Sequence, residues 1–227
     1  MITLSPLTHR LLATALPRLP RLPRPLCAAC DAQLGAASPV GPASPLCPSC
    51  TSTVLPLRGG DARVAAAFVY VGAVARALGR LKSERRADLA RPLGDLLWTA
   101  LEPRAAELQK VVVVPVPLHP ARLAERGYNQ SGLLAGRVAR RLRAPLWPSA
   151  LTRVRDTPRQ ATLPREARIA NVRSAFVARE PEHVAGRAVL LVDDVWTSGA
   201  TLDACTDTLL EAGAGVVFRS VLARAGY

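Results

Sequence analysis

Residues 189–201 read Val-Leu-Leu-Val-Asp-Asp-Val-Trp-Thr-Ser-Gly-Ala-Thr, and this stretch decides the fold. Its first four residues, 189–192, form a short run that is apolar on both faces, which predicts a buried parallel strand. Two adjacent carboxylates, Asp193 and Asp194, follow the strand, and an apolar helical pattern begins at Leu202. The segment therefore predicts a strand, an acid pair, a short loop and a helix in direct succession.

The loop just before the helix consists of small residues, which are Thr197, Ser198, Gly199, Ala200 and Thr201. A helix N-terminus offers free N–H groups and a partial positive charge to a phosphate. Small side chains let the phosphate approach the backbone, and the hydroxyls add donors. The two carboxylates can accept hydrogen bonds from vicinal ribose hydroxyls. We expect a sugar-phosphate site here; the alternative is a strand end that carries two solvated acids.

This segment resembles the 5-phosphoribosyl 1-diphosphate (PRPP) motif of type I phosphoribosyltransferases. The resemblance implies that residues 193, 194 and 197–201 bind PRPP, that Mg²⁺ accompanies the ligand, and that any reaction transfers the phosphoribosyl group to an acceptor.

Strands alternate with helices through the rest of residues 63–227, which predicts a mostly parallel α/β sheet. Residues 117–129 are expected to form a basic loop and residues 145–180 an irregular segment. The aromatic content is 4%, so the core must consist of Ala, Val and Leu. The expected strands are 64–71, 111–116, 189–192 and 216–222, and the expected helices are 74–82, 87–101, 130–142 and 202–212.

Residues 1–26 are a Pro- and Arg-rich lead in which one short helix is expected at 8–16. The module that follows, residues 27–58, carries two Cys-x-x-Cys pairs. The cysteines are Cys27, Cys30, Cys47 and Cys50. This spacing is typical of a structural zinc site of four thiolates. The alternative is two disulfides, which require an oxidising compartment. The composition between the pairs cannot bury a core, so the metal must hold this module together, and residues 51–62 are expected to be a linker.

A basic string follows the expected strand at 111–116 and ends in Asn129 and Gln130. Ligands of parallel sheets bind at the carboxyl ends of the strands, so this loop and the acid-pair loop are expected to face one crevice. Arg122 and Arg126 lie four residues apart and are candidates for clamping a diphosphate through bidentate contacts, and Asn129 and Gln130 are further candidates for contact with the ligand. The alternative for either arginine is a plain surface charge.

Four patterns together resemble the ComF family over residues 27 to about 224. They are the two Cys-x-x-Cys pairs, the string from Pro115 to Gln130, the string from Arg153 to Asn171, and the acid-pair segment. The resemblance implies a small zinc-ribbon-like module joined to a domain of the type I phosphoribosyltransferase kind, and a role in bacterial DNA uptake. In the second string, Thr157, Gln160 and Asn171 are expected to order the ligand site.

The formal net charge is +13, which favours polyanionic partners. The positive residues form either a solvated basic surface or a groove for phosphate-rich ligands or nucleic acid. No apolar run reaches the roughly 18 residues that a membrane helix needs, and the Pro-rich lead does not resemble a secretory signal, so we expect a cytoplasmic protein.

Three functions remain open. The first is a phosphoribosyltransferase of nucleotide metabolism with an unknown acceptor. The second is a non-catalytic sensor of PRPP or a nucleotide. The third is a competence factor that binds single-stranded DNA or a DNA-uptake helicase.

Overall fold

Four parallel strands form the central sheet of the computed structural model, which describes residues 26–34, 45–57, 64–156 and 175–226. The strand order is β1-β6-β5-β2, and each neighbouring pair runs parallel. The strands are β1 Val64–Val69, β2 Val111–Pro115, β5 Ala188–Trp196 and β6 Val216–Arg224. The mostly parallel α/β sheet predicted from the sequence is confirmed.

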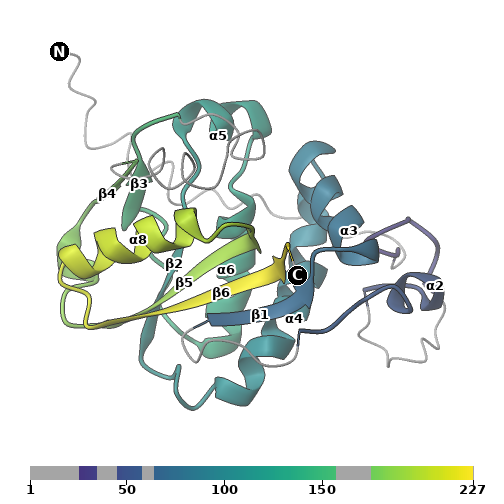
Figure 1. Cartoon of the computed structure of the whole chain (residues 1–227), viewed down its shortest axis with the longest axis horizontal. Helices are drawn as coiled ribbons and strands as arrows, with labels where there is room; N and C mark the ends of the chain where they lie inside the picture. Colours follow the sequence, from purple (N-terminus) through teal and green to yellow (C-terminus); the bar gives the residue numbers. More distant parts are fainter. Residues whose placement is uncertain (1–25, 35–44, 58–63, 157–174, 227) are drawn as a thin grey trace.

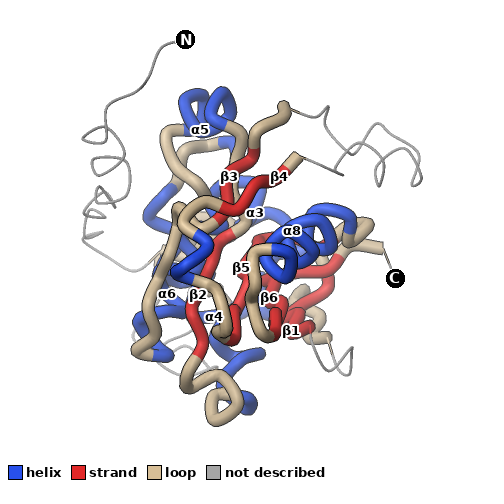
Figure 2. Tube along the Cα trace, turned by 90° about the vertical axis from the view of Figure 1, so that its left-hand side faces the viewer, coloured by secondary structure: helices blue, strands red, loops and turns tan. Residues whose placement is uncertain are grey.

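Helices cover both faces of this sheet, and Figures 1 and 2 show α8 on the face opposite α4 and α6. The long helices are α3 Gly72–Ser83, α4 Ala90–Leu101, α6 Gln130–Leu142 and α8 Ala200–Glu211. Short 3-10 turns are η1 Ala87–Leu89, η2 Glu102–Arg104 and η4 Pro181–His183. Each helix expected from the apolar periodicity is present, and η1 forms the first turn of the one expected over 87–101.

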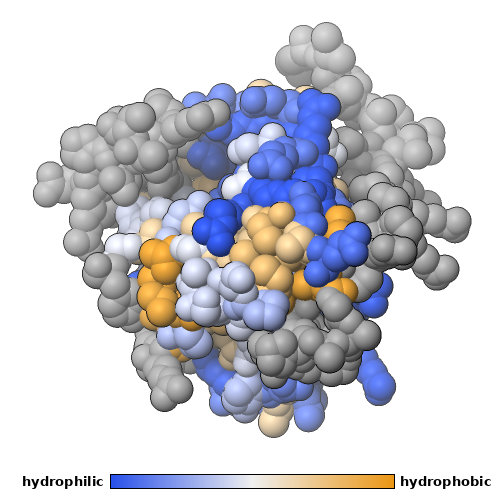
Figure 3. Space-filling view, turned by 90° about the vertical axis from the view of Figure 1, so that its right-hand side faces the viewer, coloured by the Kyte–Doolittle hydropathy of each residue, from blue (hydrophilic) through white to orange (hydrophobic). Residues whose placement is uncertain are grey.

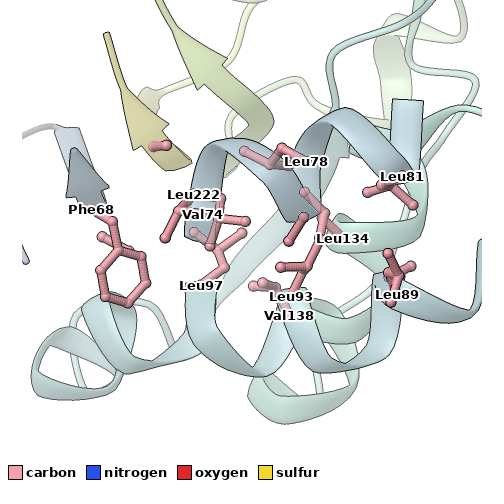
Figure 4. Close-up of a cluster of buried hydrophobic side chains, with 14 of the residues drawn as sticks. Phe68, Val74, Leu78, Leu81, Leu89, Leu93, Leu97, Leu134, Val138 and Leu222 are labelled. Carbon is pink, nitrogen blue, oxygen red and sulfur yellow. The ribbon is translucent and has the colours of Figure 1, made fainter. Parts of the chain in front are cut away.

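The side chains of β5 alternate between two apolar clusters. Leu190 and Val192 pack with α3, α4 and α6, whereas Val189 and Leu191 pack with α8. All four side chains are fully buried, as the two-sided apolar run predicts. Figure 4 shows the first cluster, in which leucine and valine side chains from the three helices meet. The largest fully buried side chains of the described chain are all leucines, which confirms the expected aliphatic core.

The basic segment 117–129 is not a continuous loop, because it contains the short helix α5 Pro120–Arg126. The side chain of His119 accepts a hydrogen bond from the Ala121 N–H at 3.4 Å, and Pro120 stands in the first turn. Gly127 ends the helix with φ +84°. A cap, a proline and a left-handed glycine also predict turns, which is why the sequence did not separate a short helix from a loop.

The segment expected to be irregular contains an antiparallel pair of short strands, β3 Leu151–Arg153 and β4 Phe176–Ala178. Its start, around Leu146, also pairs in parallel with Val113 at the outer edge of β2. These strands are too short to show an alternating pattern, so the prolines of the segment dominated the prediction. Thr157, Gln160 and Asn171 lie outside the described residues, as does the short helix expected over 8–16.

The cysteine-rich segment packs directly on the sheet domain. Cys27, Ala28 and Leu46 are at most 2% exposed and belong to the same apolar cluster as α3 and α4. The prediction of a linker over residues 51–62 is wrong in part, because residues 55–57 pair antiparallel with β1. The backbone hydrogen bonds of this pairing involve Leu55 and Leu57 and measure 2.8 and 3.0 Å. The short helix α2 Pro48–Thr51 precedes this pairing. Figure 3 shows the side of the molecule that carries α2, where the described residues in the upper centre are mostly hydrophilic.

None of the helices in the described ranges is long and apolar enough to cross a membrane.

Candidate functional site

The acid pair lies in the second half of β5, where the N-terminus of α6 and the last turn of α3 meet it. The expected end of the strand at Val192 is wrong, because β5 continues through the acid pair to Trp196 by pairing with β6. Asp193 and Asp194 are buried, with exposures of 8% and 4%. Asp193 Oδ1 accepts hydrogen bonds from Ser131 Oγ at 2.7 Å and from the Asp194 N–H at 2.9 Å. Asp194 Oδ2 lies 2.9 Å from Lys82 Nζ. These buried and partnered positions contradict the alternative of two solvated acids.

The burial of the pair changes its titration. Burial, and then the neighbouring Asp194 carboxylate, raise the pKa of Asp193 to about 7, although the Ser131 hydroxyl opposes the shift. Burial alone would lower the pKa of Lys82, but the carboxylate of Asp194 outweighs it and raises the pKa above its ordinary value. Lys82 therefore stays charged at neutral pH, whereas Asp193 titrates there.

The loop after the acid pair turns directly into α8. Gly199 has φ +87°, and a Cβ at this position would stand 2.9 Å from Trp196 Nε1. The Ala200 N–H donates to Ser198 Oγ at 3.4 Å. Since an α-helix leaves its first N–H groups without intrahelical partners, this end of α8 can receive an anion. A small hollow of about 20 Å³ lies here, lined by Asp193, Val195, Trp196, Thr197, Gly199, Thr201 and Leu202.

Asn129 and Gln130 make contacts within the protein. Asn129 Oδ1 accepts from the Ser131 N–H at 3.1 Å and so caps α6, while its Nδ2 donates to the Val116 carbonyl at 3.0 Å. Gln130 is 6% exposed, and its Oε1 accepts from the guanidinium of Arg126. Both residues thus fix the start of α6, which carries Ser131 to Asp193.

The two candidate diphosphate arginines lie on α5. Arg122 Nε is 3.3 Å from Asp156 Oδ1, and Arg126 reaches Gln130. Arg153, from β3, is a third arginine of this region: its guanidinium carbon lies 5.6 Å from the centre of the Phe176 ring. Burial, and then the charge of Arg122, lower the pKa of Arg153, while Asp193 is among the charges that raise it. Of these three arginines, Arg153 is thus the one whose charge is felt at Asp193.

Sequence reasoning missed Lys82 and Ser131 as site residues. Lys82 lies on a helix far from the motif in the sequence, and its one signal is that it is a lysine in a chain whose positive residues are nearly all arginine. Ser131 directly follows the basic string that ends in Gln130, so extending that string by one residue would have found it.

The four N-terminal cysteines form one cluster. Their sulfur atoms all lie within 4.8 Å of one another, and Cys30 Sγ is 3.7 Å from Cys47 Sγ. Four thiolates about 2.3 Å from one zinc ion at tetrahedral angles would stand about 3.8 Å apart. The cluster can therefore hold a metal ion such as zinc. All five cysteines among the described residues are free thiols, which contradicts the alternative of two disulfides.

Comparison with known proteins agrees with this arrangement. The family profile described as "Phosphoribosyl transferase domain" matches residues 129–225, from the cap of α6 to the end of β6. "Competence protein F" of Haemophilus influenzae is 32% identical over 160 residues, which cover 69% of this chain and 70% of that protein. The chain belongs to the ComF family. Its sheet domain has the phosphoribosyltransferase-like fold.

A second relative of the family is "DNA utilization protein YhgH" of Escherichia coli, 35% identical over 151 residues; the match covers 65% of this chain and 66% of that protein's length. Among solved structures, the purine phosphoribosyltransferase from Pyrococcus horikoshii is similar over 58% of this chain and 72% of its own, with 17% identity and a TM-score of 0.36.

Proposed function

We propose that the chain binds PRPP, or a closely related ribose phosphate, together with Mg²⁺ at the carboxyl end of β5. The observation that carries the proposal is the buried acid pair near the end of β5, with a small-residue loop between the end of this strand and the N-terminus of α8. The phosphoribosyl transferase profile over residues 129–225 supports it.

Each part of the site has a role in this proposal. Asp193 and Asp194 accept hydrogen bonds from the ribose hydroxyls, and the backbone N–H groups and hydroxyls of residues 197–201 hold the 5-phosphate. Arg122 or Arg126, with Mg²⁺, neutralises the diphosphate. The zinc module plays no part in this chemistry, because its four thiolates would fill the metal's coordination shell.

Phosphoribosyl transfer would break the bond between ribose C1 and a diphosphate oxygen and form a bond from C1 to the acceptor. The loop after the acid pair carries Thr197 and Ser198 and no third carboxylate that would act on an acceptor base. Ligand binding is therefore the core of the proposal. Transfer to an unknown acceptor and non-catalytic sensing of PRPP or a nucleotide are the two uses that it allows.

We further propose a role in DNA uptake. The relatives are named for competence and DNA utilization, and the net charge of +13 favours a polyanionic partner. The partner is single-stranded DNA or a DNA-uptake helicase. A structural metal site of four thiolates suits a reducing compartment, so we place this role in the cytoplasm.

Calorimetric titration of PRPP with Mg²⁺ tests the binding proposal. We expect saturable binding by the parent and a loss of about one to three orders of magnitude in affinity for the double variant Asp193→Asn/Asp194→Asn, because charge-assisted hydrogen bonds contribute about 1.5–3 kcal/mol each. Asp207→Asn, on the exposed side of α8, is the control and should bind like the parent. Equal affinity of parent and double variant would end the proposal. Diphosphate release across a panel of bases then separates transfer from sensing.

Salt titration tests the DNA role. Contact with several phosphates should make the affinity for single-stranded DNA fall by roughly 0.7 log units per contacted phosphate for each tenfold rise in salt. Binding that does not depend on salt would assign the arginines to a protein partner instead.

A further inference from the structure

Helix α3 contacts both the cysteine cluster and the acid pair. In Figure 1 it lies between α2 and the sheet. Its middle turns contact the two Cys-x-x-Cys segments, and its last turn carries Lys82, which pairs with Asp194. Arg76 and Lys82 are six residues apart, which corresponds to about 9 Å along a helix. One rigid element thus joins the two sites.

The second cysteine pair is held by the first half of α3. Arg76 Nη2 lies 3.6 Å from Cys50 Sγ, so a charged guanidinium faces a thiol that would be a metal ligand. Thr53 Oγ1 donates to the Cys50 carbonyl at 2.8 Å and accepts from the Ala73 N–H at 3.0 Å. The turn that contains Cys50 is therefore tied to the first turn of the helix.

The first cysteine pair is held by Arg80. Its Nη1 donates to the Ala28 carbonyl at 3.3 Å, and its Nη2 pairs with the carboxylate of Asp31. Arg86, just beyond the helix, also reaches Asp31, at 3.1 Å. Because Ala28 lies between Cys27 and Cys30, Arg80 fixes the backbone of this turn.

The buried face of α3 adds apolar contacts. Ala77 and Leu81 are fully buried and belong to the same apolar cluster as Cys27 and Cys47. Leu81 precedes Lys82, and its carbonyl accepts from the Tyr128 hydroxyl. Any shift of the cysteine turns that moves Arg80 therefore also moves the turn that positions Lys82.

We propose that Arg80 is a positioning residue that couples metal occupancy of the cysteine cluster to ligand affinity at the acid pair, with α3 as the rigid connection. On the ligand side this rests on the proposed binding of PRPP. Bound metal fixes the cysteine turns and, through Arg80, the last turn of α3. Lys82 is then held where it neutralises Asp194, and the acid pair keeps the geometry that accepts ribose hydroxyls.

Coupling of two sites is reciprocal, which makes the proposal measurable. In the full-length parent protein, saturating Mg²⁺–PRPP should raise zinc affinity, measured by chelator competition, by about fivefold or more. Zinc-loaded protein should bind PRPP more tightly than metal-free protein by the same factor. An unchanged zinc affinity in the presence of PRPP would overturn the coupling.

Arg80→Ala should weaken PRPP binding although the partners of Arg80 are Ala28, Asp31 and Glu84, and it should abolish the effect of PRPP on zinc affinity. Asp31→Asn removes the charge of the carboxylate that pairs with Arg80 and should weaken PRPP binding in the same direction. Because Asp31 is exposed, this variant tests the coupling even if Arg80→Ala does not fold. Arg140→Ala, an exposed arginine on α6, is the matched control and should keep the full coupling. Variants with weakened zinc binding and parental PRPP affinity would refute the role of Arg80.

Hydrogen exchange separates this proposal from the binding proposal. If the parent binds no PRPP, the proposed function fails, but the mechanical connection is still testable by removing zinc. The connection predicts that residues 72–83 and residues 193–201 lose protection together. Loss confined to residues 26–57 would overturn the connection whatever the ligand is.

Discussion

Lys82 Nζ lies 2.9 Å from Asp194 Oδ2 and supplies a positive charge to a carboxylate whose side chain is 6% exposed. The two residues come from different elements, since α3 provides the lysine and β5 the aspartate. A buried carboxylate without a nearby cation is costly, so this ion pair makes the acid pair compatible with a folded, ligand-free protein.

Lys82→Met should lower the free energy of unfolding by about 1–3 kcal/mol, because it leaves the Asp194 carboxylate buried without its partner. The loss should be smaller than for a fully buried pair, since the Lys82 side chain is 26% exposed. Adding Asp194→Asn should recover most of the loss. Urea unfolding of the two single variants and the double variant measures the coupling, and additive losses would mean that the two residues do not interact.

Asp193 should make the stability depend on pH. Its pKa is raised from 3.8 to about 7 in the folded protein, so between these values the folded state binds more protons than the unfolded state. The free energy of unfolding should therefore fall as pH rises from about 4 to about 7 and then level off. Asp193→Asn removes this fall, so the free energy of unfolding of the variant, relative to that of the parent, should rise with pH. Urea unfolding from pH 4 to 8 tests this, and parallel curves for parent and variant would contradict it.

The purified protein should carry one zinc ion per chain, held by Cys27, Cys30, Cys47 and Cys50. Cys47→Ser should abolish zinc binding and also lower the protection of α3 from hydrogen exchange, because Cys47 and α3 share one apolar cluster. Metal analysis and hydrogen exchange are the measurements. A metal-free protein with two disulfides under reducing conditions would contradict the prediction.

The parts of the fold that could be predicted are those set by local pattern. The apolar run before Asp193 specifies β5, and the small residues through Gly199 specify the start of α8. Helical periodicity also gave α6, from Gln130. These signals are contained in short windows of sequence, where the period of apolar residues and the chemistry of a helix N-terminus decide the structure.

The parts that could not be predicted depend on contacts between distant segments. Lys82 reaches Asp194 only because α3 packs beside the carboxyl end of β5, and no local pattern marks that neighbour. Leu55 was assigned to a linker because its pairing partner in β1 is set by tertiary packing. Asn129 was interpreted as a ligand contact, but the structure gives it two hydrogen bonds that fix the start of α6.

Gly199→Ala should weaken PRPP binding more than it weakens the fold. A Cβ at Gly199 would stand 2.9 Å from Trp196 Nε1, on a backbone with φ +87°, so the loop that receives the phosphate must shift. The left-handed conformation costs an alanine about 1–2 kcal/mol in stability.

Gly186→Ala is the matched control. Gly186 also has a positive φ, of +68°, but a Cβ there would have no neighbour within 4 Å. It precedes β5 at the end of the sheet opposite the acid pair. Gly199→Ala should lose at least as much stability as Gly186→Ala in urea unfolding, and only Gly199→Ala should lose PRPP affinity, by about tenfold or more for a 1.4 kcal/mol loss of binding free energy. If both variants lose PRPP affinity equally, the effect comes from general destabilisation, and the loop before α8 does not hold the phosphate.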